Sequence, residues 1–354
     1  MIQVSRGHTL VLSITFLAAL AACTSGDRPE PLSKVDIAPP VEVPPQNNVN
    51  INNPTLVVAN NFEVSADDTL ALVWSDEFDG AQLDPEVWFF EEGDGSQYDI
   101  PGWGNGELQY YLPDNASLED GLLKIEAREE SNGPFNYTSA RINTRDRFAF
   151  RYGRIEARMK LPGGQGIWPA FWLLAQDSPY GGWAASGEID IMEAVNLGGA
   201  GSNFVYGTIH YGGEAPANES TGERYFVPTD ATAEFHTYAV EWDATEIRWY
   251  VDDVLFAMQN MWSSTGGEFP APFDVPFYVI FNVAVGGFCP GSPNVDTGFP
   301  VSLGVEWVGV YSGRPADPGG WGGVQVRQAL LCGATECGRP RVEERGRWEF
   351  RDVR

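Results

Sequence analysis

The sequence has little positive charge, few histidines and few cysteines. It carries 22 Lys and Arg against 49 Asp and Glu, a net charge of −27, with only 3 His and 4 Cys. This excess of negative charge excludes a general affinity for nucleic acids and for anionic lipid surfaces, because both carry the same sign of charge. It also disfavours a strongly sulfated polysaccharide as a ligand, since sulfate groups would need basic residues around them. No residues suggest a catalytic metal or an organic cofactor.

Long hydrophobic runs are also missing. The apolar run at residues 9–20 has twelve residues, too few to span a membrane and typical of the hydrophobic region of a signal peptide. It leads into Leu-Ala-Ala-Cys at 20–23, which resembles the bacterial lipobox. That resemblance implies cleavage after residue 22 and lipidation of Cys23. The alternative is an ordinary secretory signal followed by an incidental cysteine.

The composition changes along the chain and predicts four segments. Residues 1–22 are expected to be a lipoprotein signal peptide, and 23–67, rich in Pro and Asn, a tether that begins with the lipidated cysteine. One domain is expected over 68–311, followed by an Arg- and Gly-rich tail of unknown role over 312–354. We therefore expect an exported, monomeric protein, anchored by lipid to the outer membrane or cell surface of a bacterium.

The cysteines leave one pairing question open. Cys332 and Cys337 lie five residues apart in the tail, and a local disulfide between them is plausible in an exported protein. Zinc binding there would lack the other ligands. With Cys23 lipidated, Cys289 would then be the unpaired thiol.

The segment Gly-Glu-Ile-Asp-Ile-Met-Glu at 187–193 places three carboxylates within six residues. The alternation of Glu188 and Asp190 with isoleucines predicts a half-buried strand. Plain alternation would send Glu193 into the core, where a charge costs several kcal/mol. A β-bulge at Ile191-Met192 adds one residue and returns Glu193 to the face of the other two acids. A helix would scatter the three carboxylates around its axis.

Three converging carboxylates on a rigid sheet suit glycoside hydrolysis with retention of configuration. In that chemistry one carboxylate attacks the anomeric carbon and another donates and then removes a proton. We assign Glu188 as the nucleophile and Glu193 as the acid/base, with Asp190 orienting the nucleophile. Crowding should push their pKa values apart, and the three should titrate as a coupled set. The alternative is a solvated acidic strand without chemistry.

The sequence resembles the laminarinase-like branch of glycoside hydrolase family 16, the bacterial endo-β-1,3-glucanases. Glu188, Asp190 and Glu193 match the family pattern Glu-x-Asp-x-x-Glu. Further similar segments occur in the family's order, at 74–78, 102–111, 137–142, 168–172, 207–210, 235–238 and 282–287. The resemblance implies an all-β jelly roll, a sandwich of two antiparallel sheets with an open substrate cleft on the concave side. It also implies endo-acting cleavage of laminarin-like β-1,3-glucan.

The residues support an all-β fold independently. Polar and apolar residues alternate over 154–161, as in a strand with one face in the core. A second strand is expected at 246–250, and Asp252-Asp253 before the next apolar run predicts a tight hairpin turn. The 40 glycines and 25 prolines fit short strands joined by turns.

A glycanase needs aromatic rings for the apolar faces of sugars and polar groups for their hydroxyls. The resemblance places Trp183 beside the scissile bond, and Arg141 and Asn105 where the family binds substrate. Trp168 and Trp172 share one strand face and are either sugar-stacking or core residues. His210 should border the acid/base side, although a buried, hydrogen-bonded histidine fits as well. Core positions are expected for Trp88, Trp242 and Trp249.

Two departures from the family pattern and two rival functions remain. Phe288-Cys289 replaces a polar residue followed by an aromatic, which makes that edge of the cleft uncertain. Glu306 stands where many members place an Asp near a structural calcium, so calcium is an option here. The rival functions are hydrolysis of mixed-linked β-glucan or of a marine galactan, and a surface protein that binds glucan without cleaving it.

Overall fold

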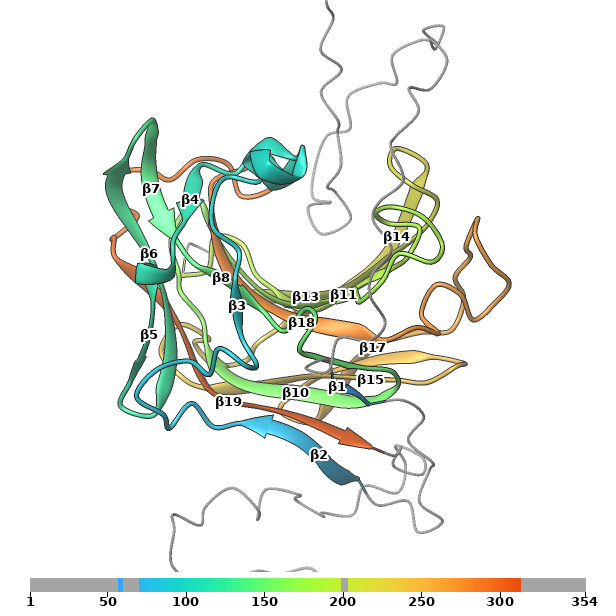
Figure 1. The fold of residues 1–354 in the computed structure, drawn as a ribbon. Helices are drawn as coiled ribbons and strands as arrows, with labels where there is room; N and C mark the ends of the chain where they lie inside the picture. The colour runs from blue at the N-terminus through green and yellow to red at the C-terminus, as the bar shows by residue number, and fades with distance from the viewer. Residues whose placement is uncertain (1–56, 60–69, 199–202, 313–354) are drawn as a thin grey trace, which may run out of the picture.

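The computed structural model describes residues 57–59, 70–198 and 203–312, and within them the chain forms two stacked β-sheets (Figure 1). Short 3-10 turns are the only helical elements of the described part: η1 Ser96–Tyr98, η2 Pro101–Gly104 and η3 Pro113–Asn115. All strand pairs are antiparallel except two. The predicted all-β sandwich is therefore confirmed.

The first sheet has nine strands and curves so that one face is concave (Figure 1). Its order is β1-β9-β18-β11-β12-β13-β14, with β8 and β3 beside β18. The bounds are β1 Val57–Ala59, β9 Phe148–Phe150, β18 Phe277–Val285, β11 Ile167–Ala175, β12 Glu188–Glu193, β13 Phe204–Gly212, β14 Asn218–Phe226, β8 Arg141–Asn143 and β3 Phe89–Phe90.

The second sheet has ten strands and packs against the convex face of the first (Figure 1). Its order is β17-β16-β15-β10-β19-β6-β7-β4, with β2 beside β19 and β5 beside β6. The bounds are β17 Val254–Gln259, β16 Ile247–Val251, β15 His236–Trp242, β10 Gly153–Lys160, β19 Val301–Ser312, β6 Leu122–Asn132, β7 Phe135–Ser139, β4 Gln109–Tyr111, β2 Ala71–Asp76 and β5 Ala116–Glu119.

The core lies between the sheets and follows the period-2 pattern of the sequence. On β10 the apolar residues Ile155, Ala157 and Met159 are fully buried, as the alternation predicted. The expected hairpin joins β16 to β17, with Asp252 and Asp253 both at positive φ, as a two-residue turn between twisted strands requires. The three tryptophans predicted to be core, Trp88, Trp242 and Trp249, are buried.

Two expectations need correction. The tether predicted over 23–67 includes β1, whose residues Val57, Val58 and Ala59 pair in parallel with β9, because β-branched residues favour extended pairing at a sheet edge. Cys289 is disulfide-bonded, so the expectation that it is the unpaired thiol is wrong. Cysteine pairing depends on proximity in the fold, which sequence spacing does not reveal.

The signal peptide of residues 1–22, Cys23, most of the tether, and the tail with Cys332 and Cys337 lie outside the described residues. In the part of the chain that is described, no helix has the length and apolar character to cross a membrane.

Candidate active site

The bulge predicted on β12 is present and places the three carboxylates on one face. On the β11 side, Met192 pairs with Phe171 and Asp190 with Trp172, so Ile191 is an extra residue. On the β13 side the register also shifts between Asp190 and Glu193. Ile191 and Met192 both point into the core and are buried. Glu193 consequently returns to the concave face with Glu188 and Asp190.

A tryptophan of the opposite sheet holds the bulge from beneath. The indole N–H of Trp249, on β16, donates to the backbone carbonyl of Asp190 over 2.8 Å across the core. Its ring occupies the space next to Gly207 on β13, where a Cβ would lie 2.4 Å from the indole. A glycine is therefore required at position 207 for the indole to reach the bulged strand.

Two further indoles hold Glu188 and Glu193, the two glutamates expected to be catalytic. Trp183 donates its N–H to Glu188 over 2.8 Å, and Trp168 donates its N–H to Glu193 over 2.8 Å. Both rings are half-buried. A hydrogen bond to a carboxylate fixes its direction and favours its charged form. Trp168 thus lies on the concave face, where its indole contacts Glu193, and not in the core.

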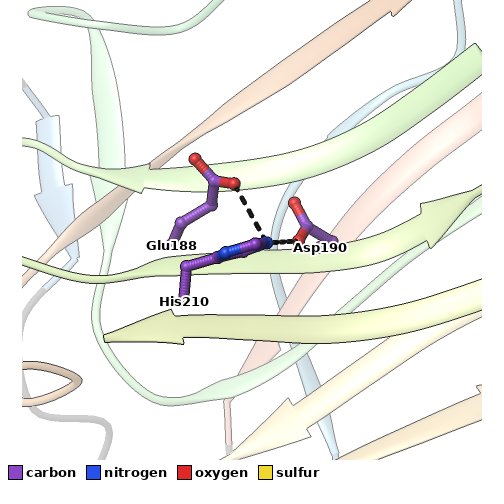
Figure 2. A group of neighbouring side chains, drawn as sticks. All are labelled: Glu188, Asp190 and His210. Atoms are coloured by element: carbon purple, nitrogen blue, oxygen red, sulfur yellow. Dashed lines mark ion pairs between the residues drawn. The ribbon is translucent and has the colours of Figure 1, made fainter. Parts of the chain in front are cut away.

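His210 lies on β13 directly opposite Glu188, and its Nε2 faces both Glu188 and Asp190 (Figure 2). The distances are 3.2 Å to Asp190 Oδ2 and 3.7 Å to Glu188 Oε1. The expectation that His210 borders the acid/base is therefore wrong: the register pairs Glu193 with Tyr206 instead. His210 is a nearly buried histidine beside the nucleophile.

Burial controls the protonation of the site. It raises the pKa of Glu188, Asp190 and Glu193 each to about 8, because the charged forms lose their hydration. The negative charge of Asp190 raises the pKa of both glutamates further, while His210 and the indole N–H groups lower it. Burial therefore favours the protonated form of each group, and because the three titrate together, Glu188 can lose its proton while Glu193 keeps one.

Arg141 lies at the side of the site away from β13. Its guanidinium is stacked between two indoles, 4.5 Å from the ring centre of Trp103 and 4.7 Å from that of Trp172, and it is ion-paired with Glu91. Only 9% of the residue is exposed. This rigid stack gives Trp172 a position on the concave face rather than in the core. Trp103 and Glu91 were not singled out from the sequence.

Asn105 is connected to the concave face by a buried polar network. Its side-chain amide donates to Glu107 over 3.0 Å, and Glu107 also accepts hydrogen bonds from Gln109 and Tyr111. Asn282 extends the network, since it donates to the Tyr111 hydroxyl. Burial raises the pKa of Glu107. The network fixes the orientation of the Asn105 side chain, whose part in substrate binding stays a prediction.

The role of Glu107 was not predicted, although the residue lies in the segment 102–111 that resembles the family. The residue sits in Gly-Glu-Leu-Gln, and a carboxylate two residues from a polar Gln on a short strand points to the same side as that Gln. That pattern is a weak signal of the network. The contribution of Asn282 depends on strands 171 residues apart in sequence, which no local pattern could reveal.

One group of side chains could hold a metal ion. Ligand atoms of Glu188, Asp190 and His210 lie within 4.8 Å of one another. Carboxylate and imidazole ligands suit several divalent ions. The same Glu188 is the expected nucleophile, and an ion bound to it would compete with attack on a sugar.

The arrangement combines a nucleophile, an adjacent acid held by a separate donor, and aromatic and arginine side chains on the same face. The glycosyl hydrolases family 16 matches residues 106–309 of the sequence. The chain belongs to this family. The match contains the bulged strand and most of the polar residues of the concave face, while Asn105 and Trp103 lie just before it.

Similar proteins agree with this membership. A protein of Rhodothermus marinus named beta-glucanase is 44% identical over 251 residues, which are 68% of this chain and 84% of the relative. Glucan endo-1,3-beta-glucosidase A1 of Niallia circulans is 41% identical over 296 residues, or 77% of this chain, but the chain spans only 41% of that relative's length. The crystal structure of the laminarinase catalytic domain of Thermotoga maritima covers 69% of this chain and 98% of its own, with a TM-score of 0.61 and 42% identity.

Proposed function

We propose that this chain is an endo-acting glycoside hydrolase that cleaves β-1,3-glucan with retention of configuration. The observation that carries the proposal is the bulge at Ile191-Met192, which brings Glu188, Asp190 and Glu193 to one face. The family membership supports hydrolysis of glycosidic bonds. The printed names of the similar proteins, a glucan endo-1,3-beta-glucosidase and a laminarinase, support β-1,3-glucan as the substrate.

In the first step Glu188 attacks the anomeric carbon, and the bond to the leaving oxygen breaks. Glu193 gives its proton to that oxygen, so the leaving sugar departs as a neutral alcohol. The indole N–H of Trp183 orients the attacking carboxylate, and His210 beside it stabilises the negative charge. The carboxylate of Asp190 lies 3.2 Å from Nε2 of His210, within ion-pair distance of that ring.

In the second step water attacks the anomeric carbon of the covalent intermediate, and Glu193 removes its proton. Glu188 leaves as a carboxylate, so both glutamates return to their starting states. Two displacements at one carbon preserve the β configuration. Burial and the charge of Asp190 raise the pKa of Glu193, which favours the protonated form that the first step requires.

A neutral glucan suits the charge of the chain better than an anionic polysaccharide. The net charge is −27, and the concave face already holds three carboxylates. A sulfated galactan would be repelled by them, whereas a glucan offers only hydroxyls and apolar ring faces. A non-catalytic glucan-binding protein has no use for three crowded acids that each cost desolvation energy.

Purified protein assayed for reducing ends on laminarin, lichenan, agarose and carrageenan tests this proposal. We expect fastest release from laminarin, short oligosaccharides as products and little activity on carrageenan. Proton NMR of the early products should show the β-anomer first. Initial release of the α-anomer, or faster cleavage of a sulfated galactan at equal salt, would contradict it.

We also propose that the protein is exported and anchored by a lipid on Cys23, on the sequence pattern alone. A bacterial lipoprotein carries several acyl chains, enough for stable membrane attachment. Cys23→Ser should move the protein from the membrane fraction to the soluble fraction, or leave the precursor unprocessed, while glucanase activity per molecule stays the same. A wild-type protein found only in the soluble fraction would reject the anchor.

We also propose that a structural calcium binds beside Glu77. Glu77 Oε1 is buried without a hydrogen-bond partner in the described structure, and its pKa is raised by burial and by the nearby charges of Asp76, Asp79 and Glu306. These oxygens fit a hard cation. Glu306, however, is ion-paired with Arg158, which would have to share it. Calcium addition should raise the unfolding temperature, and Glu77→Gln should remove that gain.

A further inference from the structure

The concave face continues past the catalytic strand onto β13 and β14, and an aromatic cluster lies there. On β13 the core side chains are Val205 and Ile209, so Phe204 and Tyr206 point to the concave face. On β14, Tyr225 packs against the core, so Arg224 and Phe226 point to the concave face. We call Phe204, Tyr206, Arg224 and Phe226 the β14 platform.

The platform is in register with the catalytic acids. Glu193 pairs with Tyr206, and Tyr206 pairs with Arg224. In the other direction the same row runs from Glu193 through Ala170 and Asn282 to Arg141. One line across the sheet thus joins Arg141 to Arg224, with the acid/base between them. A polysaccharide chain lying along this line would contact both arginines.

The spacing leaves room for substrate. Strands in a sheet are about 4.8 Å apart, so β14 lies roughly 10 Å from Glu193. A sugar next to the scissile bond fits over Tyr206, and the following sugar reaches the platform. At the next position of β13 on the concave face, the partner on β14 is Gly222. This glycine has no side chain to obstruct the path of the sugar chain.

The chemistry of the platform suits a sugar. Phe204 and Phe226 are direct cross-strand partners with ring centres 5.3 Å apart and ring planes at 70°. The guanidinium of Arg224 lies over Phe204, 4.4 Å from its ring centre. Phe226 is 53% exposed. Sheet edges normally carry charged residues or are short. An aromatic pair with an exposed ring at this edge therefore indicates a ligand-binding surface. The rings offer apolar faces, and the stacked guanidinium offers N–H donors to hydroxyls.

We propose that the β14 platform binds the leaving-group half of the glucan, across the scissile bond from Arg141. This rests on the proposed glucanase function and specifies where that substrate lies. Arg141 and the platform lie at opposite ends of the row through Glu193, so a glucan along that row has one half at each end, and the half beside β14 is the one that we assign to the leaving group. Binding here should make the enzyme favour cuts that leave several sugars on the departing fragment.

The test uses laminarihexaose with a fluorescent label at its reducing end. Phe226→Ala should lower kcat/KM by about tenfold, the loss of one ring–sugar contact. It should also shift the cut so that the labelled fragment becomes shorter, because the other half of the site then dominates binding. Phe226→Tyr keeps the ring and should keep the wild-type pattern. Val254→Ala removes a similarly exposed apolar group, 50% exposed on β17 of the other sheet, and should change nothing.

The outcomes separate this proposal from the one on which it rests. Wild-type protein that leaves the hexaose intact would refute the glucanase function itself. Wild-type cleavage with an unchanged pattern in Phe226→Ala would overturn only the platform. A uniform loss of rate without a shift in the cut would mean a structural role and would overturn it too. A shift to longer labelled fragments would overturn the assignment to the leaving-group half.

Discussion

The two sheets both bury carboxylates, but they treat them differently. On the outer face of the ten-stranded sheet, Arg154 is 2% exposed and pairs with Glu156, Glu241 and Asp253 at 2.6 to 2.9 Å. A fixed arginine balances the charge of these acids. On the concave face, a single histidine lies within ion-pair distance of Glu188 and Asp190, and Glu193 accepts a hydrogen bond from Trp168 instead.

The comparison separates a structural cluster from a reactive one. A buried carboxylate with an arginine stays ionised and holds strands together. A buried carboxylate without one has a raised pKa, as burial causes for Glu188, Asp190 and Glu193, and a proton is then available on this face for the reaction. The absence of a countercharge, rather than the number of acids, marks the catalytic face.

The largest effect is expected from removing a carboxylate of the concave face. Glu188→Gln should abolish turnover, because an amide cannot form the covalent intermediate. Glu193→Gln should lower kcat by about 10²–10⁴-fold through loss of the general acid, while laminarin binding persists. Rates on laminarin and binding by calorimetry measure both. Wild-type turnover in either variant would place the chemistry elsewhere.

The opposite face should respond in stability instead. Arg154→Met leaves Glu156 and Glu241 without their shared cation, and breaking such a buried pair costs about 3–5 kcal/mol. Lys160→Met on the same strand is the control and should change the free energy of unfolding by no more than about 0.5 kcal/mol. Urea unfolding compares them. Equal stability of both variants would mean that the Arg154 cluster is not structural.

The concave acids should lower stability as pH rises. Asp190 has a folded pKa of about 8 against an ordinary 3.8, so its protonated form is favoured on folding. That contribution is complete below pH 4 and is lost as pH rises through 8. Asp190→Asn cannot ionise, so it should match wild type near pH 3 and gain on it as pH rises toward 8, exceeding it by about 1 kcal/mol or more at pH 9. Thermal unfolding across pH would show this, and a pH-independent difference would contradict it.

The smallest effect is expected at the bond that joins the two sheets beneath the site. Trp249→Phe keeps most of the ring but loses the donor to the Asp190 carbonyl, which should cost about 1–2 kcal/mol of stability. The bulge should then hold Glu193 less well, and kcat should fall several-fold with KM nearly unchanged. Trp242→Phe is the control, since its indole donates to the carbonyl of Phe273 and not to β12. Equal kcat losses in both would indicate general weakening.

The bulged strand could be predicted because plain alternation would have buried the charge of Glu193, and an extra residue in the same strand avoids this. Three acids with buried neighbours could share a face only if Ile191-Met192 held an extra residue, and the pairing confirms it. The predicted neighbour of His210 was wrong, because that neighbour depends on the register between β12 and β13. The sequences of the two strands do not reveal this register.

Other features of the site could not be predicted because they depend on contacts between residues far apart in the sequence. The stack of Arg141 between Trp103 and Trp172 joins a turn to two strands, and each residue alone looks like an ordinary surface or core residue. The Phe204–Phe226 pair likewise appears only once β13 and β14 are in register. Alternation reveals which face a side chain takes, but not which side chains become neighbours.

Through the hydrogen bond from Trp249 to Asp190, the second sheet helps to position the strand that carries the three acids. Grafting β12 with its neighbours onto another scaffold would transfer the acids but not their alignment, unless the host supplied an indole and a gap like that at Gly207. Directed evolution of this enzyme should therefore recover activity-altering changes on β16, on the side of the molecule that never meets a sugar.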